Sequence, residues 1–174
     1  MDSLEIKLVA VVADLSTDDM QAGPPSKWRI QQIVEHLELT YSATEVVLRI
    51  RLAKERPTSS TPGLLQRGAK VMILHLGYFP SGIPAPDAVT PSPSAKPLSG
   101  KEVAASAVHH MRQMDALLDE VATAFGPSTR SASHLRLGPL NRLEWRRFHL
   151  IHGLHHIRQI EAIRHRRVSE IVLN

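Results

Sequence analysis

The chain contains no cysteine. Disulfide bonds, thiolate metal ligands and a cysteine nucleophile are therefore excluded. A transition-metal site in this chain must be built from histidine, aspartate, glutamate or water. Aromatic residues are also scarce, at 4% of the 174 residues. We therefore expect a hydrophobic core made mainly of leucine, isoleucine, valine and alanine.

Long hydrophobic runs are missing as well. No stretch of 18 apolar residues occurs, so no membrane span is expected. Asp2 and Glu5 stand where a secretory signal peptide would carry basic residues. The sequence therefore predicts a soluble, cytoplasmic protein without a membrane partner.

The charge is mildly basic and unevenly distributed. The formal net charge is +4 and the isoelectric point is about 9.8. The first twenty residues are acidic, whereas arginine accumulates in the last third, at Arg142, Arg146, Arg147, Arg158, Arg164, Arg166 and Arg167. These arginines are not interleaved with aromatic residues, and no nucleic-acid-binding motif accompanies them. Basic residues near a helix C-terminus also complement the helix dipole, so we do not expect nucleic acid as a partner.

Apolar residues recur at helical spacing over most of the chain. A long helix is expected over 27–54, after an N-cap at Ser26. Another is expected to start at a capping box formed by Ser99 and Glu102 and to end at Gly126 and Pro127. A third long helix is expected over 139–166, where Asn141 and Glu144 resemble a second capping box. Shorter helices are expected over 4–15 and 62–76, and loops over 16–27 and 128–138.

Residues 77–99 differ from the rest of the chain. The segment contains six prolines and no usable periodicity, so it must be an irregular connection. A connector of this length inside a small protein is usually a crossover or a lid. Together with the helices it predicts an all-α bundle, which we expect to form a single domain over residues 1–174.

Histidine is unusually frequent, and it is concentrated near the end of the chain. Five of the ten histidines lie within residues 149–165. His152 and His156 are one helical turn apart on a mostly apolar face, so both imidazoles can reach one metal ion. A helical histidine pair needs at least a third ligand from elsewhere. His36, in the QIVEHL segment of the first long helix, is the best candidate.

Several other polar side chains near these positions have alternative interpretations. His149 is an alternative ligand or a hydrogen-bond partner, and His155 is expected to point outward or to act indirectly. His110 lies on the inner face of its helix, where it is a core histidine, a fourth ligand or a proton carrier. Gln159 lies on the same face as the histidine pair. It could orient a metal-binding histidine by accepting a hydrogen bond from the ring N–H that does not face the metal.

Two segments resemble the DinB-like (YfiT-type) superfamily. These are WRIQQIVEHL early in the chain and GPLNRLEWRRFHLIHGLHHIRQI late in it. LGYFP and the following APDAV resemble a branch of that superfamily without an assigned function, and the likeness extends over residues 28–163. The resemblance implies a four-helix bundle with a long crossover connection and an extra short helix. It also implies a metal bound by His36, His152 and His156.

The resemblance also implies a range of activities. Some members of the superfamily are transferases or isomerases that use low-molecular-weight thiols, and nickel, zinc, manganese and iron are all plausible metals in the family. Our first hypothesis is therefore a metal-dependent enzyme, a thiol-dependent transferase or a hydrolase, acting on a small-molecule substrate. The alternative is a non-catalytic, metal-stabilised bundle that binds a small ligand or forms a homodimer. The sequence identifies neither the metal nor the reaction.

Overall fold

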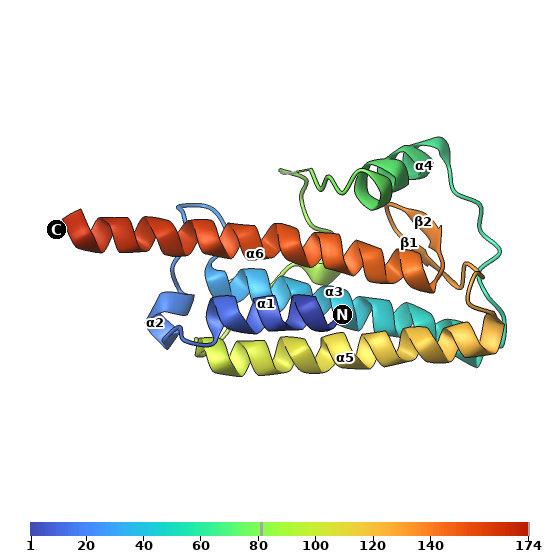
Figure 1. Cartoon of the computed structure of the whole chain (residues 1–174), viewed down its shortest axis with the longest axis horizontal. Coiled ribbons are helices and arrows are strands. Elements are labelled where there is room, and N and C mark those ends of the chain that lie inside the picture. Colours follow the sequence, from blue (N-terminus) through green and yellow to red (C-terminus); the bar gives the residue numbers. More distant parts are fainter. Residues whose placement is uncertain (81, 174) are drawn as a thin grey trace. The chain divides into compact units, whose positions relative to one another are not determined.

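Helices account for 64% of the computed structural model of the chain. The structure describes residues 1–80 and 82–173, with side chains described up to residue 167 and at residue 169. In chain order the elements (Figure 1) are α1 (Asp2–Val12), α2 (Thr17–Met20), α3 (Ile30–Ala53), α4 (Leu64–Lys70), η1 (Val71–His75), η2 (Asp87–Val89), α5 (Gly100–Phe125), β1 (Ala132–His134), β2 (Gly138–Leu140) and α6 (Arg142–Leu173). Among the described residues the strands form one small sheet, which confirms the all-α, DinB-like bundle class. None of the described helices is long and apolar enough to cross a membrane.

Reciprocal side-chain caps fix the first turns of α5 and α6. The carboxylate of Glu102 accepts hydrogen bonds from the backbone N–H of Ser99 (2.8 Å) and from its hydroxyl group (2.6 Å). At the start of α6, the backbone N–H groups of Asn141 and Glu144 donate to each other's side chains, at 3.0 and 2.9 Å. Such caps satisfy N–H groups that have no partner inside the helix. Both predicted capping boxes are confirmed.

The first long helix begins later than predicted. Ser26 cannot be its N-cap, because its φ of 57° lies in the left-handed region, whereas an N-cap residue has an extended conformation. Instead α3 begins at Ile30, and the backbone N–H of Arg29 donates to the side-chain oxygen of Gln32 at 3.1 Å. The predicted start at residue 27 is therefore wrong by three residues.

Two of the shorter segments also differ from the prediction. The predicted loop 16–27 contains the one-turn helix α2, which a capping box between Ser16 and Asp19 begins. The helix predicted over 62–76 is divided into α4 and the five-residue π-helix η1. At the end of η1 the N–H of Leu76 donates to the carbonyl of Val71 at 3.1 Å. A hydrogen bond to the residue five positions earlier defines a π-helix.

The predicted loop 128–138 contains most of a small hairpin. Strands β1 and β2 are antiparallel, with Ala132 opposite Leu140 and His134 opposite Gly138. Gly138 has a φ of 71°, a conformation that glycine adopts without steric cost. Because β2 continues to Leu140, α6 begins at Arg142 and not at residue 139 as predicted.

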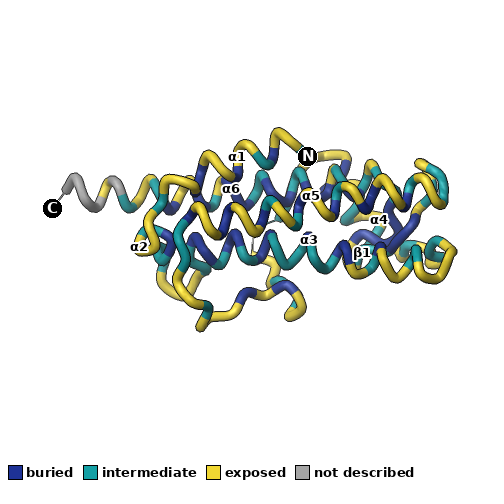
Figure 2. The backbone as a smooth tube through the Cα atoms, turned by 90° about the horizontal axis from the view of Figure 1, so that it is seen from below, coloured by how far each residue is buried: buried dark blue, intermediate teal, exposed yellow. Residues whose placement is uncertain are grey.

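The chain forms two compact units, and α3, α5 and α6 contribute to both. Unit 1 consists of Met1–Thr40, Ala85–Met111 and Gly153–Asn174, and unit 2 of Tyr41–Pro84 and Arg112–His152. Figure 2 shows buried positions recurring along the helices at helical spacing, as amphipathic helices require. The single domain over residues 1–174 stays a prediction.

Close backbone approaches hold α1 in unit 1. Leu4 and Leu8 are fully buried, and Gly153 on α6 leaves the space that Leu4 occupies. A Cβ atom at residue 153 would lie 2.7 Å from the Leu4 methyl groups. At the other end of α1, a Cβ atom at Gly100 would lie 1.7 Å from the carbonyl oxygen of Val12. These two contacts fix α1 against α5 and α6.

The uneven charge distribution of the sequence is explained by ion pairs in unit 1. Arg164 on α6 pairs with Asp14 at 2.8 Å, and Arg167 pairs with Asp18 at 2.6 Å and Asp19 at 3.2 Å. The acidic start of the chain thus contacts the basic end of α6.

The core of unit 2 is built around the beginning of α6. Trp145 is almost completely buried, as are Leu137 and Leu140 beside it in the chain. Lys70 at the end of α4 forms an ion pair with Glu144 at 2.7 Å. This unit therefore holds the hairpin and the first turns of α6 in place.

Candidate metal centre

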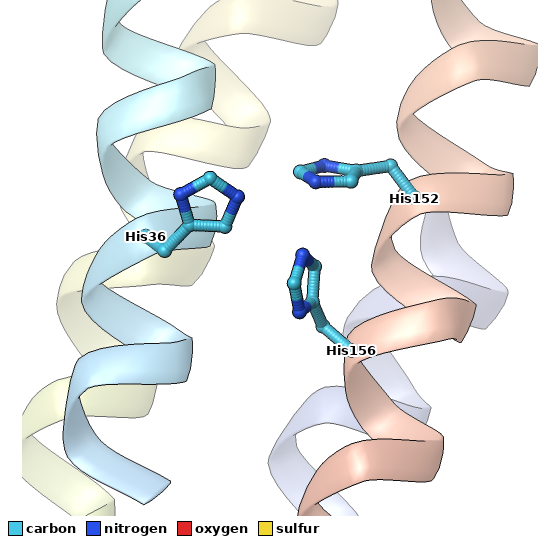
Figure 3. Close-up of side chains that lie close together, drawn as sticks. All are labelled: His36, His152 and His156. Atoms are coloured by element: carbon cyan, nitrogen blue, oxygen red, sulfur yellow. The ribbon is translucent and has the colours of Figure 1, made fainter. Parts of the chain in front are cut away.

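Three buried histidines lie together. His36 projects from α3, and His152 and His156 project from successive turns of α6 (Figure 3). Each ring offers one nitrogen atom, and these three atoms lie within 4.8 Å of one another. These three residues are 4–6% exposed. The structure therefore brings together the three side chains that the sequence singled out.

A backbone carbonyl fixes the orientation of His36. Its Nδ1 atom lies 2.7 Å from the carbonyl oxygen of Val89, which belongs to the short helix η2 inside the proline-rich connector. Because a carbonyl can only accept, Nδ1 must carry the hydrogen. In the neutral ring, Nε2 of His36 is then the nitrogen without a hydrogen. Histidines that bind a metal through one ring nitrogen commonly donate the N–H of the other nitrogen to a carbonyl or carboxylate group.

A side-chain amide fixes the orientation of His156 in the same way. Its Nδ1 atom donates to the side-chain oxygen of Gln159 at 2.8 Å. The amide nitrogen of Gln159 donates in turn to Nε2 of His155 at 3.0 Å. Gln159 therefore has the contact to His156 that an orienting role requires, and that role stays a prediction. The ring of His155 also meets the ring of His156 directly, edge to face, with centroids 5.1 Å apart.

Aromatic rings surround the histidine group. The ring of His152 stacks on Phe148, with centroids 5.4 Å apart and an interplanar angle of 11°. The ring of Phe79 approaches it at 4.9 Å. Trp28, just before α3, lies 4.8 Å from the ring of His36. Sequence reasoning assigned no role to Trp28 or Phe79, because neither is on a predicted helix face that carries a ligand.

Burial keeps the imidazoles neutral. Desolvation lowers the pKa of His36, although the hydrogen bond to Val89 opposes this effect. Desolvation and the nearby ring of His36 lower the pKa of His156 to about 3. At neutral pH both rings therefore have an available lone pair, the form in which histidine binds metals.

The donor set fits a divalent transition metal ion. Metal–nitrogen distances of roughly 2.0–2.1 Å place the ligand nitrogens of a tetrahedral site about 3.4 Å apart. The observed separations of up to 4.8 Å require only small side-chain rotations to reach that value. Three imidazoles without a thiolate suit zinc, nickel, copper and iron. The group can therefore bind a metal ion, whose identity the donors alone do not decide.

The other candidate histidines lie outside this group. His149 is completely buried and shares a 3.1 Å hydrogen bond with Thr44 through Nε2. It is thus a hydrogen-bond partner within unit 2, one of the two roles expected. Half-buried His110 lies 3.6 Å from the carboxylate of Glu38. Within the described residues, no other cluster of three or more potential metal ligands occurs.

Fold and site together define a helical-bundle protein with a buried three-histidine site that can hold a metal ion. The family model of the DinB superfamily matches residues 5–160, which include all three histidines. The chain belongs to the DinB superfamily, whose members are metal-binding proteins. No curated protein and no solved structure matches the chain.

Proposed function

We propose that His36, His152 and His156 bind one divalent transition metal ion and that the chain is a metal-dependent enzyme. The observation that carries this proposal is the convergence of three buried imidazoles. In two of them Nδ1 is already held by an acceptor, Val89 or Gln159. Metal-bound histidines typically have such an acceptor at the ring nitrogen that does not bind the metal.

The number of ligands supports a catalytic site. Structural zinc sites usually have four protein ligands, whereas catalytic sites have three and keep one position for water or substrate. When bound, the metal would supply Lewis acidity and would lower the pKa of a coordinated water or thiol. The chain's own residues hold the three nitrogens, and the rings of Trp28, Phe79 and Phe148 pack against the imidazoles.

The chemistry of the chain limits the class of reaction. The chain has no cysteine, so any thiol must come from a small molecule. We infer a transferase that uses a low-molecular-weight thiol, or else a hydrolase that uses metal-bound water. Zinc, nickel, manganese and iron are the candidate metals.

Cobalt substitution tests whether the site is open. The protein loaded with Co²⁺ should show visible absorption bands that shift when azide or 2-mercaptoethanol is added. A thiol-transfer or hydrolytic activity should depend on the metal and disappear in His36→Ala. The matched control His75→Ala, at an exposed position, should retain both. If the bands form but do not respond to either added ligand, the site is closed and structural, and the enzyme proposal fails.

A further inference from the structure

Part of the proline-rich connector is fastened to α3 through its backbone. We name residues 87–98 the strap. Four hydrogen bonds join strap backbone atoms to side chains on α3 or just before it. They are Arg29 Nη2 to the Pro93 carbonyl (2.9 Å), Gln31 Nε2 to the Lys96 carbonyl (2.8 Å), the Leu98 N–H to Gln31 Oε1 (3.0 Å) and His36 Nδ1 to the Val89 carbonyl (2.7 Å). All of these residues belong to unit 1.

Gln31 is the central anchor of the strap. Its side chain is buried, at 2% exposure, and both ends of its amide contact the strap. The amide of Gln31 has two further partners: the side-chain nitrogen of Gln21 donates to its oxygen, and its own nitrogen donates to Glu35, both at 2.7 Å. A buried amide with all these partners has one orientation only. The position of the strap relative to α3 is therefore fixed at Gln31, five residues before His36.

The contacts at Gln31 can fix the position of the strap beside His36 because the strap is stiff. It contains Pro91, Pro93 and Pro97, and each proline fixes one backbone dihedral. At its other end, η2 is closed by a hydrogen bond from the Val89 N–H to the Pro86 carbonyl at 3.0 Å. The side chain of Val89 is buried. The Val89 carbonyl is therefore held at one place, within hydrogen-bond distance of Nδ1 of His36.

We propose that Gln31 is a positioning residue for the metal ion. By anchoring the strap it presents the Val89 carbonyl to Nδ1 of His36, which fixes the tautomer and the rotation in which Nε2 faces the other two histidines. This inference rests on the proposed metal site. Because coupling between two equilibria is reciprocal, metal binding must also stabilise the strap. The connector is then part of the metal centre and not only a link between helices.

Zinc affinity tests the role of Gln31. Zn²⁺ is titrated in competition with a chromophoric chelator into wild type, Gln31→Leu and the control Gln113→Leu, whose side chain is exposed on α5. Loss of an outer contact to a metal ligand typically weakens metal binding by about 10–100-fold. We expect Gln31→Leu to bind Zn²⁺ about tenfold more weakly and Gln113→Leu to bind as wild type does. In the zinc-loaded wild type, the Nδ1–H of His36 should give a slowly exchanging ¹⁵N-coupled proton signal, which should broaden or disappear in Gln31→Leu.

Hydrogen exchange on the unaltered protein provides a test that needs no variant to fold. Zn²⁺ should increase the protection of the strap amides, including those of Val89, Thr90 and Leu98, and leave the hairpin 132–140 unchanged. If wild type binds Zn²⁺ but strap protection stays constant, or Gln31→Leu binds with wild-type affinity, this inference is overturned while the metal site stands. If wild type binds no Zn²⁺, both the inference and the proposed function fail.

Discussion

Replacing one buried histidine should change how the stability of the protein depends on pH. His149 is completely buried and stacks on Trp145. Desolvation, aided by the nearby charge of His134, lowers its pKa from 6.5 to about 3. The folded protein thus keeps this ring neutral at pH values where the unfolded chain protonates it. Stability is therefore lost as the pH falls from 6.5 towards 3.

The size of this effect follows from the pKa difference. Between these limits the unfolded state binds up to one more proton at His149 than the folded state, which lowers the free energy of unfolding by at most about 1.4 kcal/mol per pH unit. Because the unfolded ring is only half protonated at pH 6.5, the loss from pH 6.5 to 4.5 is roughly 2 kcal/mol. His134, whose pKa burial lowers to about 4, adds a loss in the same direction. Carboxylates with lowered pKa, such as Asp14 and Asp119, contribute mainly at lower pH, so this window isolates the histidines.

The variant His149→Phe removes the titrating group and retains an aromatic ring. We would measure the free energy of unfolding in urea at pH 7.5, 6.5, 5.5 and 4.5, with a chelator present so that metal binding does not contribute. The stability of wild type should fall about 2 kcal/mol further than that of His149→Phe between pH 6.5 and 4.5. The control His165→Phe, at an exposed position, should follow the wild type. A constant difference between His149→Phe and wild type across all four pH values would refute this reasoning.

The remaining predictions concern packing, capping and the metal ligands. Gly100→Ala should lower the free energy of unfolding by about 1–3 kcal/mol, because its Cβ would meet the carbonyl of Val12. Asn141→Ala should cost about 1 kcal/mol, because it removes the N-cap of α6. Gln159→Leu should weaken metal binding at least tenfold in a competition titration, because the Nδ1 atom of His156 loses its acceptor. Urea unfolding measures the first two effects.

Each of these predictions has a matched control. Gly68→Ala, on α4 with nothing within 4 Å of the added Cβ, should be neutral or stabilising. If it destabilises as much as Gly100→Ala, the steric explanation is wrong. Asn141→Asp should retain most of the capping energy. Gln113→Leu should bind metal like wild type, and equal losses in Gln113→Leu and Gln159→Leu would remove the support for an orienting role.

The sequence predicts those parts of the fold that local chemistry determines. The two confirmed capping boxes combine a polar cap with an acidic residue three positions later, and a single chain segment contains all of that information. The start of α3 is different. Ser26 has a suitable side chain, but the preceding turn places its backbone in a conformation that excludes capping. The hairpin cannot be predicted from the sequence, because its strands have only three residues each, which is too short for an alternating pattern.

The same distinction applies to the site. His152 and His156 could be predicted from helical spacing alone, and Gln159 from its place on the same face. His36 needed either the family resemblance or the structure, because nothing in its local sequence says which helix it faces. The carbonyl of Val89 left no signal at all, since every residue has a backbone carbonyl and only the folded connector selects this one.

Metal analysis of the purified protein tests the central claim most directly. Wild type, His152→Ala and the control His75→Ala are prepared without a tag, incubated with the candidate metals, dialysed and measured for transition-metal content. The three-histidine site predicts about one equivalent of one metal in wild type and His75→Ala, and little or none in His152→Ala. No bound metal in wild type, or equal content in His152→Ala, would contradict it.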